Sequence, residues 1–271
     1  MRIVTWNVHG LVGADGRRDP DRIARVLDDL AFDLAGLQEV TSGGPDALRP
    51  LTDRLPGRHA AFGPTRTPGG AAFGNAVLSR HPILATRTYD LSVPGREPRG
   101  CLRADVALPG TALHFFVAHL GLSARERRCQ AGRLLSADVL RDAALSNPLV
   151  LAGDFNAFGP GAAVPRWLVR SLTDAARAAG RVGPTFPARF PLLRLDRCYV
   201  DAALRVTACE VVATPLVRRA SDHLPLVVEL ELSAAARRPE PARDVEADGV
   251  RTELRTEGAP GDRVDPGGAA R

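Results

Sequence analysis

The chain has 271 residues, of which 45% are hydrophobic and 25% are charged, a composition that excludes a disordered or fibrous protein and is typical of a soluble globular one. Its net charge of +5 favours polyanionic partners such as nucleic acid or an anionic phospholipid surface. All 36 basic residues are arginine, so a coding bias explains the charge about as well as selection for such a partner.

The apolar segments and the cysteines of the sequence indicate where the protein is located and whether it binds structural zinc. No uninterrupted apolar run is long enough to cross a bilayer, and no apolar segment of the secretory kind precedes the first predicted strand, so we expect a cytoplasmic protein. The four cysteines lack the close pairs of a structural zinc site and are expected to be buried free thiols.

The amino-terminal part of the chain predicts a strand, a helix and a second strand. Residues 3–6 form an apolar run that ends at Asn7, and residues 34–38 form another that ends at Glu39. Between them, the Asp-Pro pair at 19–20 predicts the start of a helix whose apolar residues recur at helical spacing. Each predicted strand therefore ends in a polar side chain.

The next part of the chain predicts a loop and two strands. Residues 63–72 are rich in Gly and Pro and predict a loop, before a strand that carries Asn75 near its start. In the strand predicted at 101–106, alternation places Arg103 and Asp105 on the same face. We expect Arg103 to point toward a functional site and Asp105 toward water.

A further polar strand end lies in the middle of the chain. Residues 114–118 form an apolar run that ends at His119. Ser123, with Glu126 three residues later, forms a capping box that predicts the start of a long helix.

The stretch that follows residues 149–152 holds the most informative pair of polar residues. These four apolar residues predict a buried strand, and Gly153 lets the backbone turn or approach another segment closely. Asp154 and Asn156 lie two positions apart, so they point the same way in an extended chain. Taken alone, this pair is better explained by an Asx turn at the end of a strand, which is common.

The carboxy-terminal part predicts a loop, two strands and a tail. The loop before Asp196 carries Arg189, which could line a substrate groove because guanidinium groups match phosphate geometry. Strands are predicted at 204–214 and 224–232. The apolar periodicity then disappears, so we predict one folded domain over residues 1–233 and a disordered, charged tail rich in Pro and Gly over residues 234–271.

Polar clusters thus stand at the ends of four predicted strands. A fifth cluster, Asp222 with His223, comes directly before the last strand. Antiparallel pairing would bring the start of that strand beside the ends of the others. Such a rim would be rich in carboxylate, carboxamide and imidazole groups, which suit a hard divalent cation such as Mg2+ or Mn2+.

Seven short stretches, in this order, resemble the motif set of the endonuclease/exonuclease/phosphatase superfamily. Members of that superfamily include deoxyribonuclease I, abasic-site endonucleases, neutral sphingomyelinases and inositol polyphosphate phosphatases. The resemblance covers roughly residues 1–232, and the stretches are Thr5-Trp6-Asn7, Leu37-Gln38-Glu39, Gly74-Asn75, Ala118-His119-Leu120, Gly153-Asp154-Phe155-Asn156, Leu195-Asp196-Arg197 and Ser221-Asp222-His223.

The resemblance implies a fold and a metal site. The implied fold is a four-layered α/β sandwich, in which two packed mixed β-sheets are flanked by helices; the sequence pattern alone leaves a parallel α/β fold open. The implied principal metal ligand is Glu39, with Asn7 and Asp222 close to the ion. Asn75 resembles a superfamily position near the site.

The resemblance also implies roles for the remaining residues. His223 would act as a general base or phosphate contact, and Asp196 would accept its other N–H and fix the tautomer. Asp154 would align or deprotonate the attacking water, while Asn156 would hydrogen-bond a phosphoryl oxygen. His119 would stabilise the transition state or assist the leaving oxygen.

Three functions therefore compete. The first is a Mg2+- or Mn2+-dependent phosphodiesterase that acts on DNA or RNA, because the folded part is basic. The second is hydrolysis of a phospholipid or inositol phosphate, although no apolar hairpin for membrane insertion is evident. The third is a non-catalytic binding module on the same fold, which the full set of polar residues disfavours.

Overall fold

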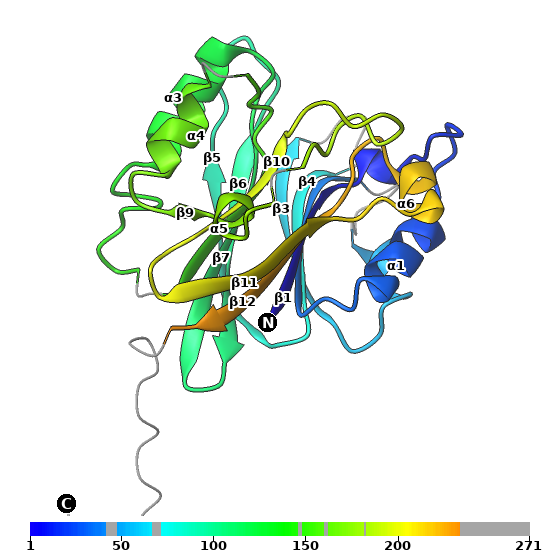
Figure 1. Cartoon of the computed structure of the whole chain (residues 1–271), viewed down its shortest axis with the longest axis horizontal. Coiled ribbons are helices and arrows are strands. Elements are labelled where there is room, and N and C mark those ends of the chain that lie inside the picture. Colours follow the sequence, from blue (N-terminus) through cyan, green and yellow to red (C-terminus); the bar gives the residue numbers. More distant parts are fainter. Residues whose placement is uncertain (42–47, 67–71, 146–147, 160–161, 182, 234–271) are drawn as a thin grey trace, which may run out of the picture. The chain divides into compact units, whose positions relative to one another are not determined.

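The computed structural model describes residues 1–41, 48–66, 72–145, 148–159, 162–181 and 183–233. The tail predicted at 234–271 lies outside these residues. Two six-stranded mixed sheets form the body of the described chain (Figure 1). In spatial order, the first sheet comprises β11 (Leu204–Val211), β12 (Leu226–Leu232), β1 (Arg2–Asn7), β2 (Leu34–Thr41), β4 (Phe73–Ser79) and β3 (His59–Arg66). The second comprises β5 (Ile83–Asp90), β6 (Gly100–Leu108), β7 (Thr111–His119), β8 (Leu149–Asp154), β10 (Asp196–Val200) and β9 (Thr173–Asp174).

The two sheets pack face to face around a shared apolar layer. Ile3, Leu34 and Val77 of the first sheet belong to the same buried cluster as Val117 and Val150 of the second. The helices are η1 (His9–Leu11), α1 (Pro20–Asp29), α2 (Arg49–Thr52), α3 (Ala124–Leu134), α4 (Ala163–Leu168), α5 (Ala175–Ala178) and α6 (Pro215–Ala220). They cover the outer faces, except for α5, which packs against the layer between the sheets. The predicted four-layered sandwich is confirmed.

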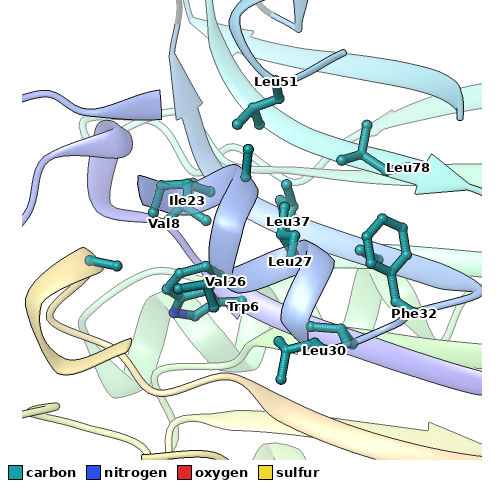
Figure 2. Packing of buried hydrophobic residues seen from close by; sticks show 14 of the residues in the cluster. Trp6, Val8, Ile23, Val26, Leu27, Leu30, Phe32, Leu37, Leu51 and Leu78 are labelled. Carbon is teal, nitrogen blue, oxygen red and sulfur yellow. The ribbon is translucent and has the colours of Figure 1, made fainter. Parts of the chain in front are cut away.

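The outer face of the first sheet is covered by α1, and this packing follows from the sequence. The Asp19 carboxylate accepts a hydrogen bond from the backbone N–H of Arg22, and Pro20 occupies the first turn, as predicted. The apolar stripe of the helix, which includes Ile23 and Leu27, packs on Trp6 and Leu37 of the sheet (Figure 2). The helix thereby anchors the strands that end in Asn7 and Glu39.

The outer face of the second sheet is covered by α3 and α4. The Ser123 hydroxyl caps α3 by accepting from the N–H of Glu126, so the predicted helix start is confirmed. Leu134 of α3 and Val164 of α4 are buried in one cluster with Phe116 and Leu151 of the sheet. These contacts fix the strands that end in His119 and Asp154.

The structure differs from the expectations of the sequence at three places. The predicted loop at 63–72 is extended at its start, because β3 continues to Arg66 at the edge of its sheet, where Gly and Pro are tolerated. Helix α6 was not predicted, although Pro215 begins it and the Thr214 hydroxyl caps it. Cys129 is exposed, unlike the other three cysteines, because it lies on the solvent side of α3.

Strand register brings the polar strand ends together. In the second sheet, parallel pairing places His119 beside Asp154, and antiparallel pairing places Asp196 beside Asp154. In the first sheet, parallel pairing places Asn7 beside Gln38, next to Glu39. Both sheets therefore present their polar residues at the same rim.

Candidate active site

Asn7 joins the two sheets at the centre of the site. Its amide nitrogen Nδ2 donates to Oε1 of Glu39 at 3.0 Å and to Oδ2 of Asp154 at 3.1 Å. Because Glu39 belongs to the first sheet and Asp154 to the second, this side chain holds carboxylates from both sheets around one point. All three residues come from strand ends that the sequence singled out.

The backbone around these residues departs from regular geometry. Glu39 has a positive φ of 57°, where the pairing of β2 with β4 shifts register between Leu37 and Val40. Such an irregularity re-aims a side chain at the edge of a site. Asn156 also has a positive φ, of 47°. At Gly153, an added Cβ would lie 1.9 Å from the carbonyl oxygen of Ala118, so only glycine fits there.

His223 is held by Asp196 and faces Asp154. Its Nδ1–H donates to Oδ2 of Asp196 at 2.9 Å, and its Nε2 lies 3.7 Å from Oδ2 of Asp154. Burial lowers the pKa of this imidazole, but the charge of Asp196 and the hydrogen bond to it outweigh burial and raise the pKa to about 10. The ring of Phe186 packs on the imidazole, with 4.8 Å between ring centroids. The imidazole is therefore positively charged at neutral pH in the metal-free protein.

Asp154 lies between the two imidazoles. Its Oδ1 accepts from the backbone N–H of Asn156 at 2.9 Å, and its Oδ2 lies 3.6 Å from Nε2 of His119. Burial and the nearby charge of Asp196 raise the pKa of Asp154 to about 6. This carboxyl can therefore exchange a proton near neutral pH.

His119 is surrounded by hydrogen-bond donors. Nη1 of Arg99 lies 3.1 Å from its Nδ1, and Nδ2 of Asn156 lies 3.3 Å from its Nε2. Burial, followed by the charge of Arg99, holds the pKa of His119 well below its usual range. This imidazole is therefore neutral, whereas His223 is charged.

Arg99 and His9 contact the site and were not predicted as site residues. Arg99 comes directly before β6, and Asp222 and His223 likewise come shortly before a strand, β12, so placement near a strand start was the available signal. Its Nη2 donates to Glu97 at 2.7 Å. The ring nitrogen Nδ1 of His9 lies 3.4 Å from Oδ2 of Asp222 and 3.9 Å from Oε2 of Glu39. The sequence signal for His9 was its closeness to Asn7.

Two groups of side chains carry atoms that could bind a cation. The carboxylates of Glu39 and Asp222 are 25% and 40% exposed and converge on His9, which leaves room for water ligands. Asp154, Asp196 and His223 form a second, buried group with ligand atoms within 4.8 Å of one another. Within the described residues, Oδ1 of Asp196 is buried without a hydrogen-bond partner. This donor chemistry fits a hard divalent cation.

Three further predicted site residues lie apart from this centre. Asn75 is buried and donates to the carbonyls of Gly100 and Val117, at 2.9 and 3.3 Å, so it ties the first sheet to the second. Arg103 makes two 2.7 Å hydrogen bonds to Asp105, and the structure does not bring it to the cluster around Asn7 and Asp154. Its neighbour Leu102 faces the layer between the sheets, so Arg103 points to the opposite face.

Arg189 also lies apart from the centre. Its side chain is exposed, and its guanidinium stands 5.8 Å from the ring centroid of Phe190. It belongs to the segment 185–195, whose start contacts the site, because Phe186 packs on His223. Arg189 thus lies in a segment that adjoins the site, and its guanidinium lies beside the ring of Phe190.

The comparison with protein families accounts for this arrangement. A model of the Endonuclease/Exonuclease/phosphatase family matches residues 4–223, which span every polar residue described above from Asn7 to His223. The chain belongs to this family. Membership in the endonuclease/exonuclease/phosphatase family makes it a phosphoric ester hydrolase, and the predicted resemblance is confirmed.

Individual members of the family are similar over most of the chain. The uncharacterized protein YbhP of Escherichia coli K12 is 34% identical over 86% of this chain and 96% of its own length. The mannosyl-6-phosphatase Bt3783 of Bacteroides thetaiotaomicron has a TM-score of 0.72 and 20% identity, covering 86% of this chain and 100% of its own. TDP2 of D. rerio, solved with a single-strand DNA product, has a TM-score of 0.69 and 20% identity, covering 85% of this chain and 98% of its own.

One membrane property can be read from the helices. Among the described residues, none of the helices has both the length and the apolar character that spanning a bilayer requires.

Proposed function

We propose that the chain is a phosphodiesterase that depends on Mg2+ or Mn2+. The observation that carries this proposal is the placement of Asp154, whose Oδ2 lies 3.6 Å from Nε2 of His119 and 3.7 Å from Nε2 of His223. A carboxyl with a pKa near neutrality thus stands between a neutral and a charged imidazole. Phosphodiester cleavage needs such a set of proton-accepting and charge-stabilising groups.

The ion would be held by Glu39, Asn7 and Asp222. Their donor atoms are oxygens, and the two carboxylates are open enough to leave coordination positions for water. When bound, the ion supplies positive charge to the non-bridging oxygens of the phosphate. A support for this assignment is that the hydrogen bond from Asn7 orients Glu39.

The chain's own residues supply the remaining chemistry. Asp154 would orient the attacking water and accept its proton, because its raised pKa makes the carboxylate a stronger base. His223 carries a positive charge and would hydrogen-bond a phosphoryl oxygen through Nε2 while Asp196 holds Nδ1. Of its two predicted roles, the phosphate contact is the better supported. Asn156 and His119 would donate to the other oxygens.

Nucleic acid is the first substrate class to test. The net charge of +5 suits a polyanion, and TDP2, which shares the fold, has been solved with a single-strand DNA product. A phospholipid is the second class, because exposed apolar side chains lie in loops that adjoin the site residues in the chain.

The test is hydrolysis of bis-p-nitrophenyl phosphate and of plasmid DNA, each with and without Mg2+ or Mn2+. We expect metal-dependent hydrolysis of the small diester, and DNA cleavage in addition if nucleic acid is the substrate. An Asp154→Asn variant should lose the diesterase activity, whereas the matched control Asp142→Asn, which changes a partly exposed carboxylate that pairs with Arg87, should keep it. Equal activity in the Asp154 variant would contradict the proposal.

A further inference from the structure

The loops around the site carry most of the exposed apolar side chains. Six large hydrophobic residues are exposed in the part of the chain that the structure describes, and four of them lie in three loops next to catalytic residues. We call these four the apolar rim: Leu122, Phe158, Phe190 and Leu192, which are 70%, 52%, 68% and 79% exposed. Soluble proteins rarely gather such residues around one site unless that surface has a partner.

The apolar rim surrounds the catalytic group because of strand register. Leu122 follows His119 by three residues, and Phe158 follows Asp154 by four. Leu192 precedes Asp196 by four residues. These three catalytic residues are neighbours in the sheet, so Leu122, Phe158 and Leu192 each lie within ~14 Å of chain from one of them. Phe190 lies two residues before Leu192 in the same loop.

Two buried arginines bind the loops to one another. The guanidinium of Arg127 donates to the carbonyl of Leu122 and stands 5.8 Å from the ring centroid of Phe158. The guanidinium of Arg197 donates to the carbonyls of Ala157 and Arg194, at 2.9 and 3.2 Å. The three loops therefore form one connected surface.

Exposed arginines stand among the rim residues. Arg125 and Arg128 follow Leu122 on the first turns of α3, and Arg189 stands beside Phe190. Apolar tips interspersed with exposed cations match the chemistry of an anionic membrane surface, in which acyl chains lie beneath negatively charged headgroups.

We infer that the apolar rim docks the catalytic face onto an anionic lipid surface. All four rim residues can enter the acyl region, whereas only Phe158 and Phe190 carry a ring on which an unpaired base could stack, and the two most exposed rim residues are leucines. The inference rests on the proposed phosphodiesterase activity and favours, of the two substrate classes proposed above, the phospholipid over nucleic acid, because the phosphodiester of a phospholipid lies at the depth of the headgroups.

The experiment is co-sedimentation with vesicles of equal parts phosphatidylcholine and phosphatidylglycerol, beside vesicles of phosphatidylcholine alone. The full chain should bind the anionic vesicles, and added salt should weaken binding. A Leu122→Ser, Leu192→Ser double variant should bind about 100-fold more weakly, about tenfold for each leucine. The matched control is Leu84→Ser, which removes a leucine 63% exposed on β5 outside the three rim loops and should bind like the parent chain.

The inference would be overturned if the parent chain did not bind the vesicles, or if the double variant bound them equally well. Binding of a single-stranded oligonucleotide is measured in parallel. The inference would also be overturned if the double variant weakened oligonucleotide binding alone. If the double variant melts at a lower temperature than the parent, Leu192→Ser alone decides the question, because Leu192 is the most exposed rim residue. Hydrolysis of bis-p-nitrophenyl phosphate by the parent chain tests the phosphodiesterase separately, so the two proposals can fail independently.

Discussion

Nη1 of Arg99 lies 3.1 Å from Nδ1 of His119, and the contact is buried. A guanidinium can only donate, so this ring nitrogen cannot carry a proton while the contact is intact. The other ring nitrogen, Nε2, then carries the single proton of the neutral imidazole and faces the carboxylates of Asp154 and Glu39, at 3.6 and 3.8 Å. Such a group can serve as a hydrogen-bonding partner for an oxygen without adding charge.

Replacing Arg99 by Gln should therefore change the protonation of His119. We expect the pKa of His119 to rise, because the charge of Arg99 is removed and the Gln carbonyl can accept from the ring. Diester turnover should fall on the order of 10- to 100-fold. Titration of the imidazole proton signals by NMR measures the first effect. The control is Arg96→Gln in the same loop, which removes an exposed arginine; an unchanged His119 pKa in the Arg99 variant would refute this role.

Replacing Glu39 by Gln should remove the response of the protein to metal. The variant keeps the hydrogen bond from Asn7 but loses the charge, so affinity for Mg2+ or Mn2+ should fall on the order of 100-fold. The measurement is the rise in melting temperature with added metal. Glu231→Gln, a change at an exposed carboxylate near the other end of β12, should respond like the parent chain. If both variants respond alike, Glu39 is not a ligand.

Asp196→Asn should alter both turnover and the pH dependence of stability. In the metal-free protein, His223 has a pKa raised to about 10, above the usual value of 6.5. The ion pair therefore stabilises the fold fully below pH 6.5, and this stabilisation is lost as pH rises through about 10. Melting temperatures in chelator should show this loss in the parent and a flatter profile in the variant, with turnover lower by about 100-fold or more. Parallel profiles would rule out this pairing.

Gly153→Ala should destabilise the protein because the new Cβ would meet the Ala118 carbonyl at 1.9 Å, and φ is +149°. We expect a loss of ~3 kcal/mol in the free energy of unfolding, measured by chemical denaturation. Gly132→Ala is the matched control, since nothing lies within 4 Å of its Cβ position in α3. Removing a helical glycine should stabilise by about 0.5–1 kcal/mol. A neutral result at Gly153 would show that the two strands can separate locally.

Short-range pattern was enough to predict much of this site. Asp154 and Asn156 follow an apolar run and lie two positions apart, so both side chains were expected to point the same way. The structure places both beside His119. The position of Arg99 could not be predicted in this way, because its contact with His119 depends on the conformation of the loop before β6. Alternation correctly placed Arg103 and Asp105 on one face, but it cannot tell which face of a strand meets the site.

The hydrogen bonds of Asn7 and Asn75 span the gap between the sheets. A fragment that contains only one of the two sheets could therefore not assemble the site. A folding intermediate in which both sheets are formed but not yet packed together would show no diesterase activity. Recovery of activity during refolding thus reports when the two sheets dock, and is expected to lag behind the formation of either sheet.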